Sequence, residues 1–228
     1  MRLPLLVGLA VLGAAVFGFA RMSGAATESP AYRVVQSFDG WEVRAYEPRL
    51  EARVTTTGAS FERAVSAGFR VLADFIFGNN EPATEVAMTT PVSASSTKIA
   101  MTTPVAAEPS ERGWEVAFTM PSEYTAETLP RPRDGRVRIV EVPGGTWAAI
   151  RFRGTAGAGH EEMTQRLMDG VAAAGLRVAG PPVVAQYNPP WIPPMARKNE
   201  ILVPLDLSDV ASGRDVATPD AAPEGDKS

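Results

Sequence analysis

The order of predicted secondary-structure elements constrains the fold most, because the same order occurs twice along the chain. In the first half, the strand-like runs Tyr32–Phe38 and Trp41–Tyr46 flank Asp39-Gly40, a dipeptide typical of a tight hairpin turn. A third run, Leu50–Thr57, alternates and is rich in Val and Thr, as a strand should be. A helical segment follows these three strands.

The first helix is predicted to begin after Ser60, a residue type that caps helices, and to end near Gly78. Apolar residues recur there at spacings of three and four, with polar residues on the other face. The apolar positions are Phe61, Val65, Phe69, Leu72 and Ile76.

The second half repeats this order of strands, helix and strands. Its helix carries Met163, Leu167 and Val171 on one face. Its predicted strands are Trp114–Met120, Val137–Val142, Thr146–Phe152, Pro182–Tyr187 and Ile201–Leu205. Runs of strands punctuated by single helices indicate an α+β fold, with an antiparallel sheet on which the helices pack. The duplication also suggests a pseudo-two-fold axis and a groove where helix and sheet faces meet.

The chain termini differ from the middle in composition. Residues 1–26 combine Arg2, the apolar run Leu3–Ala20 and the small residues Gly24-Ala25-Ala26, a pattern typical of a cleaved signal peptide. An uncleaved membrane anchor is the alternative. Both place the domain, residues 27–207, outside the cytoplasm: periplasmic, extracellular or membrane-anchored. Residues 208–228 are rich in Asp, Ala, Gly, Pro and Ser, and predict a disordered acidic tail.

Composition and motifs exclude several classes of function. The net charge is −4 and no long Lys/Arg cluster occurs, which argues against a nucleic-acid partner. There is no cysteine, so disulfides and thiolate sites are excluded. The chain also contains a single histidine and no recognised nucleophile, metalloprotease or nucleotide motif. We therefore expect a protein that is not an enzyme.

A short motif, AMTTPV, occurs twice. Residues 85–92 are nearly repeated as residues 98–105, with small polar residues between the copies. We expect the copies to form a hairpin, with Pro91 and Pro104 at edges or bulges because proline lacks the N–H that a central strand needs.

With these motifs the sequence resembles the SOUL haem-binding family. The resemblance covers Tyr32 to Leu205 and is carried by both AMTTPV copies and by residues 75–80, 118–132, 187–191 and 197–200. It implies a distorted antiparallel β-barrel of two pseudo-symmetric repeats, flanked by two main helices. It also implies that haem or a porphyrin binds in a hydrophobic cleft beside the first helix, without catalytic residues.

The resemblance directs attention to seven candidate haem-cleft residues. They are Val65, Phe69, Arg70, Leu72, Met88, Met101 and Trp191. Arg70 is the candidate partner for a haem propionate, and Trp191 lies in a stiff Pro-rich loop that either covers the groove or packs on the barrel end. Met88 or Met101 could ligate iron through a thioether sulfur, although adaptable core filling is the commoner role of methionine. His160 does not match a family ligand. We therefore expect burial of the haem macrocycle to contribute more to binding than coordination of the iron.

Three functions therefore remain open. The first is non-enzymatic binding of haem or a tetrapyrrole, as a carrier, scavenger or buffer. The second is a general small-molecule module, similar to the effector-binding domains of gyrase-inhibitory and transcription-regulator proteins. The third is an envelope interaction protein without a small ligand. A membrane is expected as a partner only through the N-terminal segment.

Overall fold

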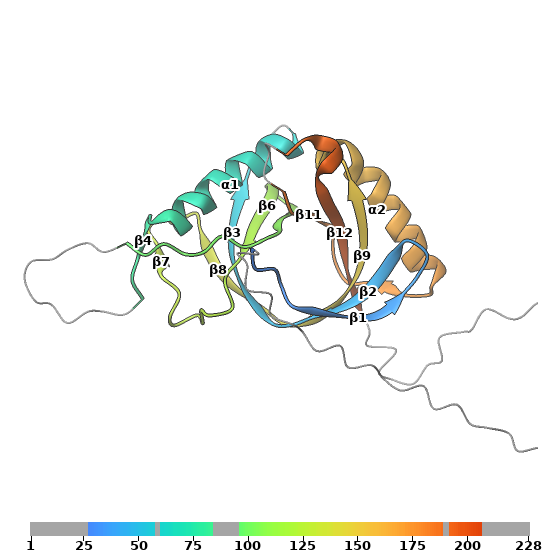
Figure 1. The fold of residues 1–228 in the computed structure, drawn as a ribbon, viewed down its shortest axis with the longest axis horizontal. Helices are drawn as coiled ribbons and strands as arrows, with labels where there is room; N and C mark the ends of the chain where they lie inside the picture. Colours follow the sequence, from blue (N-terminus) through green and yellow to red (C-terminus); the bar gives the residue numbers. More distant parts are fainter. Residues whose placement is uncertain (1–26, 58–59, 84–95, 189–191, 207–228) are drawn as a thin grey trace, which may run out of the picture.

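The fold is a curled antiparallel sheet with two helices on its outer side (Figure 1). The computed structural model describes residues 27–57, 60–83, 96–188 and 192–206. The helices are α1 (Phe61–Phe77) and α2 (Ala156–Ala173), with a short 3₁₀ turn, η1 (Pro194–Ala196). The strands of the main sheet are β1 (Tyr32–Ser37), β2 (Trp41–Tyr46), β3 (Arg49–Thr56), β5 (Val105–Ser110), β6 (Gly113–Thr119), β8 (Arg138–Val142), β9 (Gly145–Arg153), β10 (Arg177–Val178), β11 (Val183–Gln186) and β12 (Lys198–Asp206). A separate small sheet joins β4 (Asn80–Glu81) to β7 (Arg131–Pro132).

The strand order shows the internal repeat. It runs β1-β2-β9-β12-β11-β5-β6-β3-β8, with β10 paired to β12. On either side of the β11–β5 junction the order is mirrored, because β9-β12-β11 corresponds to β3-β6-β5. The paired strands are antiparallel. The predicted α+β fold, a distorted barrel of two pseudo-symmetric repeats with two main helices, is confirmed.

Helix α1 begins and ends where the sequence predicts. The Ser60 hydroxyl accepts a hydrogen bond from the Arg63 backbone N–H, and Gly78 ends the helix with a φ of 131°, which favours glycine. The apolar face packs on β3 and β6. Gly68 allows a close approach there, since a Cβ at this position would lie 2.6 Å from the Val116 side chain.

Helix α2 packs on β9 and β12 through Leu167 and Val171, both fully buried. The two helices meet through aromatic side chains, because the His160 ring of α2 stacks on Phe61 of α1 at 5.0 Å. Within the described residues, no helix is long and apolar enough to cross a membrane.

The expected AMTTPV hairpin is wrong for the copy that the structure describes. Residues 98–104 contain no strand, and β5 begins only at Val105. The backbone of this segment forms hydrogen bonds with separate parts of the fold instead. The Ile99 N–H donates to the Ile76 carbonyl and the Thr103 N–H to the Glu28 carbonyl, and both bonds are 2.8 Å long. Thr102 donates its hydroxyl to the Thr119 carbonyl. The first copy, residues 85–92, lies outside the described residues, as do residues 1–26 and 208–228.

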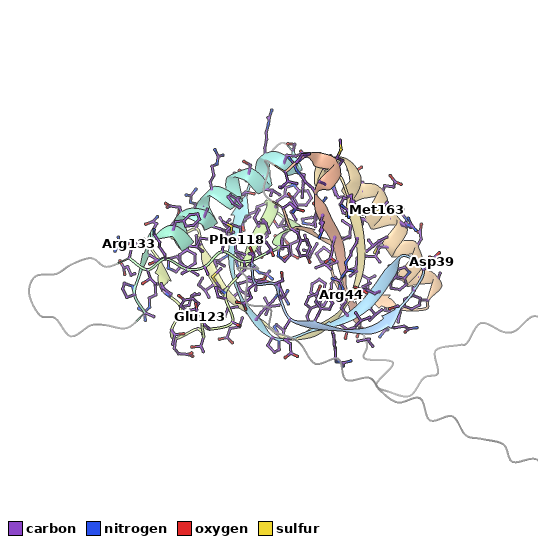
Figure 2. All side chains as sticks on the ribbon, in the orientation of Figure 1. Asp39, Arg44, Phe118, Glu123, Arg133 and Met163 are labelled. Carbon is purple, nitrogen blue, oxygen red and sulfur yellow. The ribbon has the colours of Figure 1, made fainter. Side chains whose placement is uncertain are left out.

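The two faces of the sheet differ in chemistry. On β3, Ala52 and Val54 contact the core under α1, while Glu51 and Arg53 alternate with them and point the other way. Figure 2 shows Phe118 beneath α1 and Arg44 inside the curl. The helices therefore cover an apolar outer face, and the curl encloses a polar inner face.

Candidate functional site

A pocket of about 570 Å³ lies on the inner face of the curl, between strands of both repeats and the N-terminal segment at Ser29-Pro30. Its walls combine small residues, including Ala106 and Ala117, with aromatic rings. The aromatic residues are Tyr32, Tyr46, Trp147, Phe152 and Tyr187. A second hollow of about 750 Å³ adjoins it and is lined by residues 28–31 and 47–50 and by the segments around residues 119–127 and 141–143.

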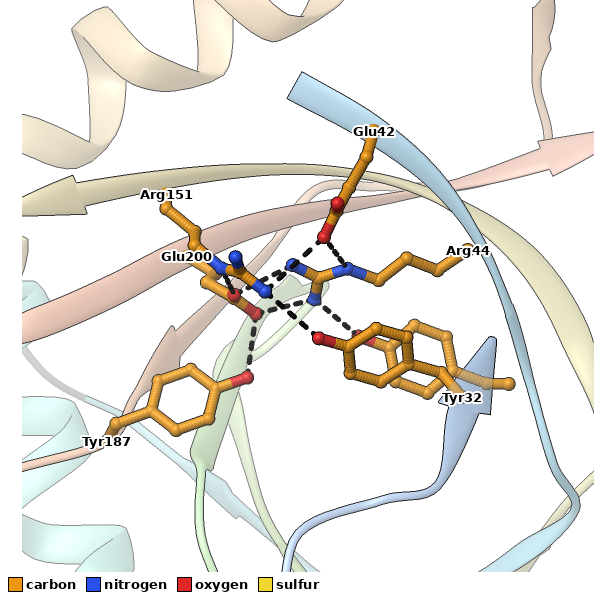
Figure 3. A network of polar contacts seen from close by, with 7 residues as sticks. Tyr32, Glu42, Arg44, Arg151, Tyr187 and Glu200 are labelled. Carbon is orange, nitrogen blue, oxygen red and sulfur yellow. Dashed lines mark hydrogen bonds and ion pairs between the residues drawn. The ribbon is translucent and has the colours of Figure 1, made fainter. Parts of the chain in front are cut away.

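Glu200 of β12 is the centre of one polar network at this pocket (Figure 3). Its carboxylate accepts two bonds from Arg44 on β2, both of 2.8 Å. It also accepts a hydrogen bond of 2.8 Å from Arg151 Nε and one of 2.7 Å from the Tyr187 hydroxyl. An ionised carboxylate offers about four lone-pair positions, so all of its acceptor capacity is used.

This network keeps Glu200 ionised, and Tyr46 and Tyr187 remain protonated. Burial alone would raise the pKa of Glu200, but the hydrogen bonds from Arg44 and Tyr187 outweigh it and the pKa is lowered. Burial raises the pKa of Tyr187, and the negative charge of Glu200 raises it further. Burial also raises the pKa of Tyr46.

Arg44 is held from several sides. Its side chain has 0% exposure, and Nε lies 2.7 Å from Glu42. Nη1 donates to the Tyr46 hydroxyl over 2.9 Å, and the guanidinium carbon lies 4.4 Å from the Tyr32 ring centre. This buried arginine links β2 to β12 across the intervening β9.

The other repeat contributes a second network around Glu51 of β3. Arg49 and Arg53 contact its carboxylate over 2.6 and 2.7 Å. Arg53 also reaches Glu115 over 2.7 Å and Glu108 over 3.1 Å. Burial raises the pKa of Glu108, an effect that the Arg53 charge opposes. Arg49 is less satisfied, because its Nη1 atom is buried without a hydrogen-bond partner.

The sequence-predicted site residues lie elsewhere. Val65 and Leu72 are buried in the core beneath α1, and the Phe69 ring contacts Phe118 at 5.4 Å. Arg70 is exposed on α1, and Met101 is 38% exposed. None of these five residues lines the 570 Å³ pocket. The remaining two, Met88 and Trp191, lie outside the described residues.

Sequence reasoning missed Arg44, Glu51 and Glu200, although a signal was present. In the segments Trp41–Tyr46 and Arg49–Val54, charged residues alternate with apolar ones. In a sheet covered by helices on one face, this alternation indicates a second face that is polar. Among the described residues, no three His, Asp or Glu side chains form a group that could hold a metal ion.

Comparisons with known proteins agree with the fold. The structure is similar to EcmrR in a cryo-EM structure of an EcmrR–DNA complex, with a TM-score of 0.50 and 12% identity over 73% of this chain and 57% of that chain. It is also similar to the EcmrR C-terminal domain, with a TM-score of 0.49 and 12% identity over 77% of this chain and 98% of that chain. A hydrolase from Listeria innocua has a TM-score of 0.46 and 13% identity over 73% of this chain and 91% of that chain.

No curated protein matches the chain. The sequence model described as "SOUL heme-binding protein" matches residues 27–204, most of the chain and nearly all of the described fold. The protein therefore belongs to the SOUL heme-binding protein family.

Proposed function

We propose that this protein binds haem or a related tetrapyrrole, without catalysis, in the pocket on the inner face of the sheet. The pocket itself carries the proposal, because its volume of about 570 Å³ lies within the range of about 300–1,000 Å³ typical of small-molecule sites. Family membership supplies the ligand class. The predicted cleft beside α1 is the alternative location.

The lining of the pocket suits a flat ring. Trp147 and Tyr46 lie edge to face, with ring centres 6.5 Å apart, and the small alanine side chains of β5 and β6 also line the pocket. Removing apolar area from water contributes about 25 cal/mol per Å². Because a tetrapyrrole has two apolar faces, its burial supplies most of the expected affinity.

The described lining lacks the side chains that most often ligate haem iron. It contains no histidine or methionine. Tyrosine can ligate haem iron as a phenolate, but the Tyr187 hydroxyl donates to Glu200 and its raised pKa opposes ionisation. We therefore propose that the ring is held by burial and polar contacts at its edge.

The pairing of the carboxylates supports a role in binding rather than catalysis. Glu51, Glu115 and Glu200 each contact at least one arginine at 2.8 Å or less. A carboxylate engaged in this way is a poor general base, since its lone pairs are occupied by the arginine N–H groups. The predicted export signal suggests where the protein acts. We therefore propose a tetrapyrrole carrier, scavenger or buffer outside the cytoplasm.

A haemin titration of residues 27–206 tests the proposal. We expect a saturable Soret shift with one haemin per chain. Ala106→Trp should fill the pocket and weaken binding at least tenfold, whereas Ala172→Trp, on the exposed face of α2, should not. Circular dichroism confirms that each variant is folded.

Two other results would contradict the proposal. Absence of saturable binding would favour the general small-molecule module, for which the charged inner face is the supporting observation. If Ala106→Trp binds like the wild type while Arg70→Ala weakens binding, the ligand lies beside α1 instead.

A further inference from the structure

Two basic residues face each other at the edge of the pocket. Arg153, the last residue of β9, is the direct cross-strand partner of Lys198, the first residue of β12. Both side chains are exposed, and both line the pocket. Like charges at directly opposed positions destabilise a sheet, so this pair is unfavourable when no anion is bound.

The other basic side chains at the pocket are compensated. Arg49, Arg53 and Arg151 contact Glu51, Glu115 or Glu200. Within the described part of the chain, no carboxylate lies within 4.0 Å of either Arg153 or Lys198. These two are therefore cations without a counter-charge on the described surface.

The two most buried carboxylates of the pocket, Glu51 and Glu200, are not available to a cationic ligand. Five basic and four acidic residues line it. Glu200 already accepts four hydrogen bonds, and Glu51 is bridged by Arg49 and Arg53. An incoming cation would meet these two neutralised carboxylates and the uncompensated positive charge of Arg153 and Lys198.

We infer that this pocket selects anionic ligands, with Arg153 and Lys198 binding a carboxylate. The ligand class is a flat aromatic carboxylate, and organic cations are excluded. The inference rests on the proposed function only in its choice of ring, since a tetrapyrrole with propionate groups belongs to this class.

Three haemin derivatives that share the same macrocycle but differ in side-chain charge test the inference. They are the free diacid, its dimethyl ester and its bis(2-aminoethyl)amide, which is cationic. We expect the ester to bind at least tenfold more weakly than the diacid, and the amide more weakly still. Raising KCl from 0.05 to 0.5 M should weaken binding of the diacid and leave the ester unchanged.

Matched variants assign the effect to the two cations. The double variant Arg153→Glu/Lys198→Glu should reverse the order, so that the amide binds more tightly than the diacid. Arg112→Glu removes an exposed cation from the β5–β6 turn, outside the pocket lining, and should preserve the wild-type order.

The outcomes separate the two proposals. If all three derivatives bind equally, or the amide binds best, the charge inference is overturned while tetrapyrrole binding stands. If none binds, tetrapyrrole binding fails, and pyrenebutyrate and pyrenemethylammonium then test charge selection by pyrene fluorescence. Preference for the butyrate supports the inference; equal binding or none overturns it.

Discussion

Arg44 is a buried charged side chain whose removal should strongly destabilise the inner face of the sheet. It has no exposed side-chain surface and bonds to Glu42, Tyr46 and Glu200. Removing one partner of a buried ion pair costs about 3–5 kcal/mol, because the other charge remains buried. We expect Arg44→Met to lower the free energy of unfolding by about this amount, measured by urea denaturation.

A double substitution separates the charge from the packing. Replacing both partners by apolar residues is often much less costly than replacing one. Arg44→Met/Glu200→Leu should therefore be more stable than Arg44→Met alone, and Arg112→Met, on the surface, should change stability by less than about 0.5 kcal/mol. A cost below about 1 kcal/mol for Arg44→Met would contradict this view of the network.

Glu200 should also make stability depend on pH. Its pKa is lowered in the folded state despite burial, chiefly by Arg44 and Tyr187. The stabilising contribution is thus complete above the unfolded pKa of about 4.3 and is lost as the pH falls through the lowered folded value. The stability difference between wild type and Glu200→Gln should be largest near pH 7 and shrink towards pH 3.

Urea unfolding at pH 7, 5 and 3 measures this difference. Glu123→Gln, on an exposed loop, serves as the control and should show a small difference at every pH. A difference for Glu200→Gln that is equal at pH 7 and pH 3 would show that its ionisation is not linked to folding.

Helix α1 depends on one close contact with the sheet. An added Cβ at Gly68 would lie 2.6 Å from both Cβ and Cγ2 of Val116. Alanine improves helix propensity by about 1 kcal/mol, but overpacking typically costs about 1–3 kcal/mol. We expect Gly68→Ala to destabilise the protein by up to about 2 kcal/mol in urea denaturation, because the clash exceeds the propensity gain.

Two further variants check the cause. Val116→Ala in the Gly68→Ala background should recover part of the loss, and Ser66→Ala, on the exposed face of α1, should be neutral or slightly stabilising. A stabilised Gly68→Ala protein would mean that the helix can move away from β6 without loss.

Local signals explain why most elements were predictable. The hairpin at Asp39-Gly40, the Ser60 cap and the Gly78 terminus depend on neighbours in sequence, so their patterns identify them directly. The segment after Lys98 was not predictable in the same way. Its N–H groups bond to Glu28 and Ile76, and no local pattern reports such distant partners.

The pocket depends on the closure of the sheet and was harder to predict. The family resemblance directed attention to α1, while residues of the pocket come from both repeats, such as Arg49 of β3 and Trp147 of β9. Alternation along a strand reveals a polar face. Only the curl of the sheet brings the polar faces of both repeats around one space.

This shared construction predicts how a ligand should affect unfolding. A ligand that binds only the folded state adds RT ln(1 + [L]/Kd) to stability, about 2.7 kcal/mol at a free concentration of 100 Kd. Because the pocket uses strands of both repeats, haemin at this concentration should stabilise them together and preserve one cooperative transition. Circular dichroism and tryptophan fluorescence should report the same midpoint in urea.

The Ala106→Trp variant provides the control for this effect. With the pocket filled and binding at least tenfold weaker, haemin at the same concentration should add no more than about 1.4 kcal/mol to its stability. Its transition without ligand should remain cooperative. Two separate transitions in the haemin-bound wild type, with only one of them shifted, would place the ligand on a single repeat. In that case the inner face would not be the binding site, because a guest there contacts strands of both repeats at once.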